Sequence, residues 1–321
     1  MRAERRCGIA PAAGDTGTLM PRTPSTSLVF IVLASMAYGL LVMTLCLPSM
    51  QDWPALFSAS QAQVQLTFSA YVGCYGLAQL VYGPLADRLG RKRVLLGGMM
   101  LSALGCALGA LATDLNMVVL ARALQGAGGA SGMVVGRALV QDLFEGRDRT
   151  RMMAYVGMTM GVCPPLASLI GGQLHVSLGW ASNFVLALLL ALAFIVAAWR
   201  GLPDVAAPQA LQASGWQQAR AAYGHLLRQP AFLLYAGVMA TTSATAYTYF
   251  AGAPMVLKAM GVGPQSLGWF IMAVPLPYVL GNILTSRLIH RHGDRRLMLW
   301  GQVLTMAGLV AMAALAGVPA Y

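Results

Sequence analysis

Charged residues are scarce in this chain of 321 residues, and acidic residues are scarcer than basic ones. Asp, Glu, Lys and Arg make up 10% of the sequence, with ten acids against 21 bases, whereas 58% of the residues are hydrophobic. A soluble domain has charged residues at about a quarter of its positions, so this composition excludes a soluble globular protein. Cysteine is also rare, and the five cysteines without paired spacing predict neither disulfides nor a metal site. We expect no cofactor.

Nine apolar segments are long enough to cross a lipid bilayer. A helix needs roughly 20 predominantly apolar residues to cross a hydrocarbon core about 30 Å thick. We therefore predict an all-α integral membrane protein, with the bilayer as its surroundings. The predicted spans are Leu28–Leu47, Val64–Tyr82, Val94–Ala112, Met117–Leu139, Met153–Leu174, Phe184–Trp199, Ala231–Ala253, Leu267–Leu288 and Leu297–Val318.

The basic residues lie almost entirely on one side of these spans. If the N-terminus is cytoplasmic, 18 of the 21 basic residues fall in cytoplasmic segments; Arg122 and Arg137 lie inside the fourth span, and Lys258 alone lies on the outer side. Cytoplasmic loops of membrane proteins carry an excess of Lys and Arg. The net charge of +11 therefore indicates orientation, and we expect no nucleic-acid partner.

A polar segment divides the spans into two groups. Residues 201–230 form the longest polar interruption and separate six spans in residues 28–200 from three in residues 231–321, while residues 1–27 form a polar cytoplasmic extension. The segment DRLGRKRVLLGG after the second span is weakly echoed by SRLIHRHGDRRLMLWG after the eighth. Internal repeats of this kind are typical of transporters, so we predict a six-helix bundle, a cytoplasmic linker and the first three helices of a second bundle.

The loop after the second span, GPLADRLGRKRV, concentrates charge in an apolar region. Its glycines permit tight turning, and its acid is placed to meet helix N-termini or arginines. An ordinary basic anchor loop would not need this order of residues. The loop resembles the G-x-x-x-D-R-x-G-R-[RK] motif of the major facilitator superfamily. The resemblance implies a cytoplasmic latch between two bundles, which holds the outward-open state and is formed by Gly83, Asp87, Arg88, Gly90, Arg91 and Lys92.

The fourth span contains RALQGAGGASG, which begins at Arg122. A glycine-rich nucleotide loop would follow a strand, so we interpret these glycines as positions of close helix packing. An arginine inside a span costs at least about 2.5 to 3.5 kcal/mol and normally marks a transport pathway. The segment resembles the R-x-x-Q-G motif of the superfamily's fourth helix, and we take Arg122 and Gln125 as candidate substrate-cavity residues.

The fifth span contains GMTMGVCPPLASLIGG. Proline kinks a helix and glycine permits sliding contact, so a merely flexible helix is one interpretation. The other is a resemblance to the fifth-helix signature of drug antiporters in the superfamily. That signature would be carried here by Gly157, Gly161, Pro164, Pro165, Gly171 and Gly172.

Longer segments, among them CLPSM, RALVQDLF and YTYFAGAPMVL, resemble the Bcr/CflA drug-resistance family from about Thr44 to the end of the chain. That family usually has Asp where this sequence has Thr44, and Pro in the fifth helix where it has Ser168. Thr44 is a candidate cavity residue, and Tyr247 and Tyr249, with Phe250, are candidate cavity aromatics for flat hydrophobic drugs. Packing between helices is an equal alternative for each tyrosine.

The resemblance implies a multidrug efflux transporter of the bacterial inner membrane. It would exchange small hydrophobic drug-like substrates for protons by alternating access, and no nucleophile and base pair suggests an enzyme. Two alternatives remain: a nutrient importer of the same superfamily, against which the fifth span argues, and a truncated chain that is inactive alone, because nine spans supply three of four three-helix units. No acid lies in the middle of a span. We therefore expect either that the coupling carboxylate of a twelve-helix version lies in the three helices beyond these nine, or that the substrates are neutral or anionic and attracted to Arg122.

Overall fold

The computed structural model describes residues 26–203, 215–272 and 275–316, and every regular element in these residues is a helix. The predicted all-α class is therefore confirmed. The N-terminal half comprises α1 (Thr26–Leu45), η1 (Pro48–Gln51), α2 (Trp53–Leu56), α3 (Gln61–Leu89), α4 (Arg91–Ala110), α5 (Leu115–Leu143), α6 (Gly146–Leu178) and α7 (Ala181–Gly201). The C-terminal half comprises α10 (Pro230–Ala259), α11 (Pro264–Met272), α12 (Pro275–His292) and α13 (Asp294–Ala316), and α9 (Gly215–Leu226) lies between the halves.

Six of the described helical segments are long and apolar enough by themselves to cross a membrane. They are Thr26–Gln51, Arg91–Ala110, Leu115–Leu143, Arg151–Leu178, Ala181–Gly201 and Arg295–Ala314. The predicted second and seventh spans fall on α3 and α10, which are long but carry many Gln, Ser, Thr and Tyr residues. The predicted eighth span differs more, because it is divided between the shorter helices α11 and α12. Most of the predicted N-terminal extension lies outside the described residues.

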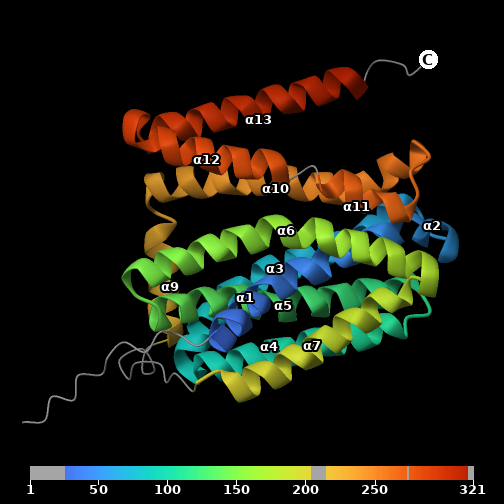
Figure 1. Ribbon diagram of the computed structural model, residues 1–321, viewed down its shortest axis with the longest axis horizontal. Coiled ribbons are helices and arrows are strands. Elements are labelled where there is room, and N and C mark those ends of the chain that lie inside the picture. Colours follow the sequence, from blue (N-terminus) through green and yellow to red (C-terminus); the bar gives the residue numbers. More distant parts are fainter. Residues whose placement is uncertain (1–25, 204–214, 273–274, 317–321) are drawn as a thin grey trace, which may run out of the picture.

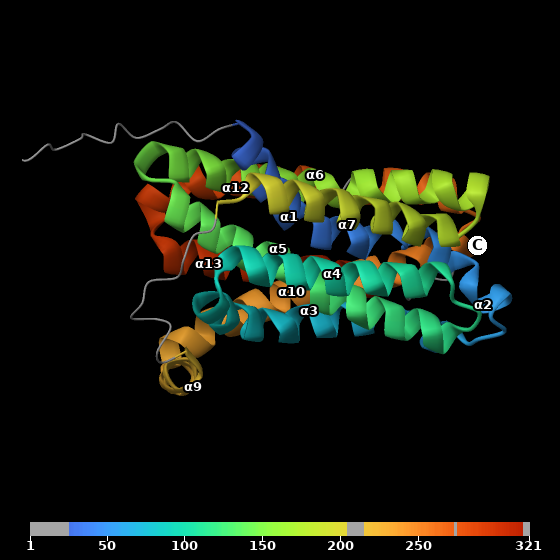
Figure 2. The ribbon, with the colours of Figure 1, turned by 90° about the horizontal axis from the view of Figure 1, so that it is seen from below.

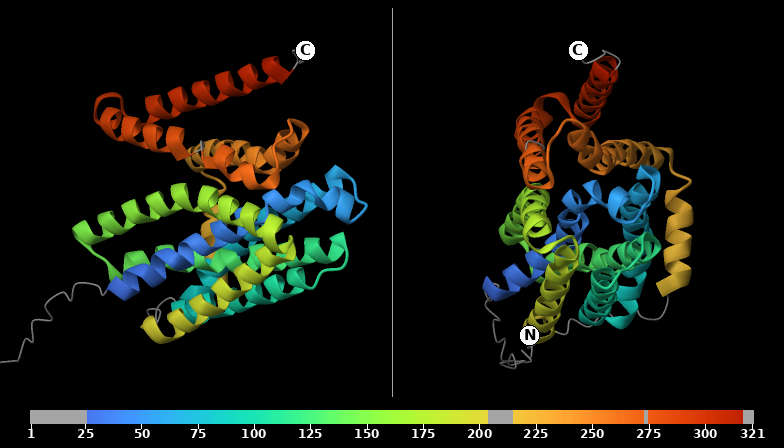
Figure 3. Two further views of the ribbon diagram at one scale, coloured as in Figure 1. Left: turned by 45° about the vertical axis from the view of Figure 1, so that its right-hand side comes forward. Right: turned by 90° about the vertical axis from the view of Figure 1, so that its right-hand side faces the viewer.

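The long helices run side by side, and successive helices alternate in direction (Figure 1). We call the end that carries η1 and α2 the α2 end, and the opposite end, where α3 meets α4 and α5 meets α6, the basic end. Within the N-terminal half, α5 packs against α1, α3 and α4, and α7 packs against α1 and α4. The C-terminal half rests on the N-terminal half mainly through α11, which lies against α6 (Figure 3).

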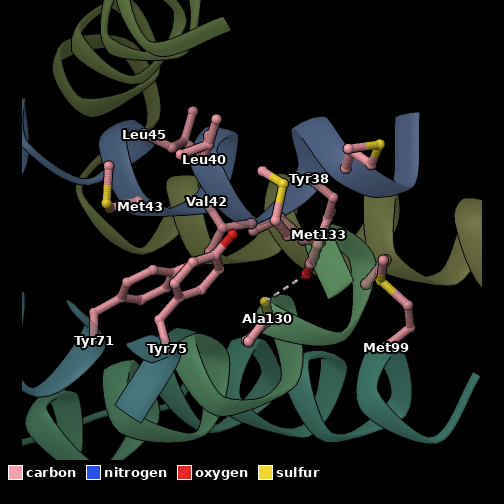
Figure 4. Packing of buried hydrophobic residues seen from close by; sticks show 14 of the residues in the cluster. Tyr38, Leu40, Val42, Met43, Leu45, Tyr71, Tyr75, Met99, Ala130 and Met133 are labelled. Atoms are coloured by element: carbon pink, nitrogen blue, oxygen red, sulfur yellow. Dashed lines mark hydrogen bonds between the residues drawn. The ribbon is translucent and has the colours of Figure 1, made fainter. Parts of the chain in front are cut away.

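The core of the N-terminal half depends on small residues in α5. A side chain at Gly128 would collide with the backbone of α4 at Gly98 and Ser102, and one at Gly132 would collide with the carbonyl of Ser35 on α1. These contacts confirm that the glycines of the fourth span permit close helix packing. Larger side chains from α1, α3, α4 and α5 fill the space around them (Figure 4).

The outside of the bundle is apolar. Leu77 on α3, Leu104 on α4 and Leu189 on α7 each expose more than half of their surface. Large exposed hydrophobic areas are rare on soluble monomers, whereas a bilayer solvates them. The surface therefore agrees with the membrane location predicted from composition.

Part of the predicted linker is the helix α9. In Figure 2 it is seen nearly end-on while the long helices run across the view, so it lies across their direction. It packs against α3, where the hydroxyl of Tyr223 donates a hydrogen bond to the carbonyl of Leu80 (3.1 Å). The described helix of the connection thus packs against the N-terminal half.

Candidate functional site

The predicted latch residues form the junction between α3 and α4 at the basic end. Gly90 ends α3 and precedes α4, and its φ of 94° lies in the region that favours glycine. Gly83 lies in the preceding turns of α3, and outside its own stretch of helix backbone no described atom lies within 4 Å of where a Cβ would be. The junction is therefore a tight turn between two helices.

The charged latch residues contact the N-terminal half. The guanidinium of Arg91 binds Asp87 on α3 (2.5 Å) and Asp142 on α5 (3.2 Å), so it joins three helices. Lys92 donates to the carbonyl of Leu202 (2.9 Å), and Arg88 is exposed. Partly exposed pairs of this kind contribute about 1 kcal/mol or less each.

Arg122 on α5 is buried, with 2% of its surface exposed. Its guanidinium donates to the carbonyls of Val42 (2.9 Å) and Met43 (3.0 Å) on α1 and to the side-chain oxygen of Gln125 (3.0 Å). It also lies over the ring of Tyr71, 4.3 Å from the centroid. In the part of the chain that the structure describes, neutral groups thus satisfy this cation and no carboxylate pairs with it.

Of the other predicted polar cavity residues, Gln125 contacts Arg122, and Thr44 follows Met43, whose carbonyl Arg122 binds. Gln125 donates to the sulfur of Cys106 (3.2 Å), and Thr44 is fully buried and donates to the carbonyl of Leu40 (3.0 Å). The structure therefore joins Arg122 and Gln125 where α5 packs on α1, with Thr44 next to one of the α1 carbonyls that Arg122 binds. In this conformation they contact protein groups and are closed off from solvent.

Aromatic residues line the contact between the two halves. Tyr247 on α10 meets Phe68 on α3 edge to face, with ring centroids 6.5 Å apart, and Tyr71 and Tyr75 stack one turn further along α3 (Figure 4). Tyr249 has 36% of its surface exposed. Among the predicted aromatics, Tyr247 therefore lies at the contact between the halves and Tyr249 is partly open.

The glycines and prolines of the fifth span occupy one uninterrupted helix, α6. Pro164 and Pro165 are buried inside it. A side chain at Gly171 would collide with the carbonyl of Leu45 on α1, and one at Gly172 would collide with the carbonyl of Pro264 on α11. These two glycines therefore allow α6 to lie close to α1 within the N-terminal half and to α11 of the C-terminal half.

The two other glycines of this motif are Gly157 and Gly161. Gly157 has open space around it, and Gly161 is half-buried.

Two residues near the same interface were not selected from the sequence. Arg137 on α5 is exposed and makes no hydrogen bond or ion pair with any described residue. Tyr75 is 8% exposed, its hydroxyl has no hydrogen-bond partner among the described residues, and it is within electrostatic reach of Arg137 and Tyr247. The signal for Arg137 was present in the sequence, because a cation within a predicted span is unusual. Tyr75 carries no comparable signal.

The helical architecture and the loop after α3 define a class of membrane protein. A family model described as Major Facilitator Superfamily matches residues 26–317. The chain therefore belongs to the major facilitator superfamily, a family of transporters.

Several relatives are named for drug resistance. The chain is 32% identical to multidrug resistance protein D of Escherichia coli (strain K12) over 182 residues, which cover 56% of this chain and 46% of that protein. It is 27% identical to a chloramphenicol resistance protein of Pseudomonas aeruginosa over 273 residues (84% of this chain, 64% of that protein). A solved D-xylose-proton symporter shares the fold with a TM-score of 0.59, 15% identity and coverage of 83% of this chain and 69% of that one. The predicted resemblance to drug-resistance transporters is confirmed, and the matches to the two drug-resistance proteins span about half to two thirds of their length.

Proposed function

We propose that the protein is a multidrug efflux transporter that exchanges small hydrophobic compounds for protons by alternating access. The observation that carries this proposal is membership of the superfamily together with similarity to proteins named for multidrug and chloramphenicol resistance. The order of Gly and Pro in α6 supports export over nutrient import, because it resembles the signature of drug antiporters. The basic end would face the cytoplasm and the protein would lie in the bacterial inner membrane, in accord with the distribution of Lys and Arg.

The proposed substrate site is the aromatic contact between the halves. Phe68 on α3 faces Tyr247 on α10, and Tyr75 lies near Tyr247 with a hydroxyl that has no hydrogen-bond partner in the described part of the chain. Aromatic rings offer flat apolar surfaces, and a single hydroxyl can orient a polar group of a ligand. A small aromatic compound would therefore bind by separating Phe68 from Tyr247 and stacking between them.

The charges near this contact favour neutral or anionic substrates. Arg137 on α5 is a cation without a hydrogen bond or ion pair to any described residue, whereas Arg122 is already bound to carbonyls of α1. The carboxylates in the described helices and turns lie at helix ends, as for Asp87 and Asp142 at the basic end. An anionic group would gain from Arg137, and a cationic drug would find no buried carboxylate in this part of the chain.

The proposal keeps the role predicted for the latch residues, which is to hold the outward-open state. Among the described residues, Arg91 and Lys92 bind groups of the N-terminal half. We propose that in the outward-open state these residues reach the C-terminal half at the basic end, and that Asp87 and Asp142 hold Arg91 in position until then.

Drug binding to the purified chain tests the proposal without requiring transport. Binding of chloramphenicol and of an anionic aromatic dye would be measured by quenching of tryptophan fluorescence in detergent. Tyr247→Ala is expected to weaken binding about 5-fold or more, in line with the loss of one aromatic contact of about 1 kcal/mol. Tyr235→Ala is the matched control, because Tyr235 lies on the same helix with 49% of its surface exposed, and it should leave binding unchanged.

Transport then separates export from import. Inverted membrane vesicles are prepared from a drug-hypersensitive host that expresses the chain. Uptake of the same dye into these vesicles is measured with and without an imposed pH gradient. Binding of xylose with no binding of either drug would overturn the proposal in favour of a nutrient importer. Drug binding without transport would identify the chain as a binding-competent part that is inactive alone.

A further inference from the structure

The two halves meet closely at the α2 end. Gln51, at the end of η1, donates from its side chain to the carbonyl of Pro254 on α10 (2.9 Å) and is buried. On α6, Gly172 lies against Pro264, and a side chain at Gly268 on α11 would meet Leu169 at 2.6 Å. The α2 end is therefore closed by backbone packing and by a polar contact between the halves.

An ion-pair cluster covers this closed contact. One carboxylate oxygen of Asp52 lies 3.0 Å from Nζ of Lys258 at the end of α10, and the other lies 2.9 Å from Nε2 of His175 in the last turn of α6. Lys258 also donates to the carbonyl of Gln51. Asp52 is thus bound to the N-terminal half through His175 and to the C-terminal half through Lys258.

The basic end lacks an equivalent contact among the described residues. Arg91 and Lys92, together with their partners Asp87, Asp142 and Leu202, all belong to the N-terminal half. Of the salt bridges that the described residues form, the one between Asp52 and Lys258 joins the halves. Lys258 is also the basic residue that departed from the predicted charge distribution, and the functions assigned so far do not explain its place.

We propose that Asp52 and Lys258 form an outer gate, an ion pair that holds the α2 end closed and breaks when the halves part at that end. This inference rests on the proposed alternating access. His175 is a positioning residue, because its hydrogen bond keeps the Asp52 carboxylate turned toward Lys258. The surrounding charge supports the assignment: burial raises the pKa of the Asp52 carboxyl, but hydrogen bonds and charge from His175 and Lys258 outweigh it and lower that pKa below its usual value of 3.8.

The pair biases the closed state without locking it. About half of the side-chain surface of Asp52 and of Lys258 is exposed, and water weakens such pairs, so that removing one partner changes an equilibrium by about 5-fold or less. A weak bias suits a gate, because a transporter must open and close within each cycle. The remaining contacts, such as that of Gln51, keep the end closed on average.

Thiol reactivity at the closed contact tests this gate. Leu267 on α11 is fully buried, and α11 packs mainly on α6. The variant Leu267→Cys, made in a chain whose five native cysteines are replaced by alanine, is reacted in detergent with a charged maleimide. Adding Lys258→Gln or Asp52→Asn should raise the labelling rate 2- to 5-fold, and adding both should raise it no further. His175→Gln, which keeps a donor, should have a smaller effect.

Two controls distinguish gate opening from unfolding. Arg93→Gln removes an exposed cation at the basic end and should leave labelling of Cys at position 267 unchanged. Labelling of Met260→Cys, at a residue with 71% of its surface exposed, should be fast and equal in all variants.

Equal labelling rates of Cys at position 267 with and without Lys258→Gln would overturn the proposed gate. Additive effects of Lys258→Gln and Asp52→Asn on that rate would overturn it too. The labelling experiment needs no substrate. Failure of drug binding would therefore contradict the proposed function without contradicting the gate.

Discussion

Arg122 Nη1 lies 2.9 Å from the carbonyl oxygen of Val42, so a cation on α5 binds the last turn of α1. The final carbonyls of a helix have no partner within that helix, and the helix dipole makes this end negative. Val42 and Met43 are among the last four residues of α1. The end of one helix thus supplies the counter-charge for an arginine of another, which explains how Arg122 stays buried beside neutral groups.

Replacing Arg122 should destabilise the protein. In Arg122→Gln two carbonyls of α1 lose their donor and the contact with Tyr71 is lost, and we expect a fall in the free energy of unfolding of about 2 to 4 kcal/mol. Thermal unfolding in detergent measures this change. Arg137→Gln is the matched control on the same helix and should change stability by less than about 0.5 kcal/mol. Equal losses in the two variants would contradict the assignment.

The glycines of α5 give a second prediction. Gly128→Ala should cost about 1 to 3 kcal/mol of stability, because its methyl group would collide with the backbone of Ser102. Gly97→Ala on α4 has open space around it and should instead gain up to about 1 kcal/mol from its better helix propensity. The difference in sign between two identical substitutions can be read from unfolding in a mild denaturing detergent. A gain in both variants would show that the helices are less tightly packed than described.

The latch junction predicts energetic coupling between Arg91 and Asp142. A double-mutant cycle with Arg91→Gln and Asp142→Asn should give a coupling free energy of about 0.2 to 1 kcal/mol, as expected for a partly exposed pair. Arg93 is exposed and next but one to Arg91, and its cycle with Asp142 should give no coupling. Coupling of the same size in both cycles would mean that general charge, and not the contact, is responsible.

The Asp52 carboxyl predicts a defined pH dependence. Its pKa in the folded protein is lowered, so its stabilising contribution is fully present above the unfolded value of 3.8 and is lost as pH falls through the lower folded value. The groups that face it are Lys258 and His175, so the test uses His175→Gln to remove the imidazole charge. In that background we compare the free energy of unfolding of the chain with Asp52 and of the Asp52→Asn variant. The difference should be constant from about pH 8 to pH 5 and shrink below about pH 4. A change between pH 5 and pH 8 would contradict it.

The sequence was sufficient for the long apolar helices and for the tight turn at Gly90. Length and hydrophobicity define α1, α4 and α7, because a bilayer demands about 20 apolar residues whatever their order. The same criterion missed α9, whose twelve residues are mostly polar or small, and it merged α11 with α12. Neither a polar helix beside the spans nor a break within an apolar run changes the average hydrophobicity of a long window.

The partners of the charged residues were harder to predict than the residues themselves. Arg122 was evident as a cation in a span, but its acceptors are main-chain carbonyls of α1. Every residue has such a carbonyl, so the sequence does not show which ones bind Arg122. Lys258 was evident as an exception to the charge distribution, but Asp52 lies 206 positions earlier in the chain. Only the folded arrangement of the helices brings such groups together.

The helix α9 shortens the tether between the two halves. Twelve residues reach up to about 40 Å when extended, but about 18 Å as an α-helix, and the hydrogen bond of Tyr223 fastens this piece to α3. A short tether keeps two parts at an effective concentration in the millimolar range. When Asp52 and Lys258 separate, they therefore meet again on the same molecule, and the closing rate of the α2 end should not depend on protein concentration.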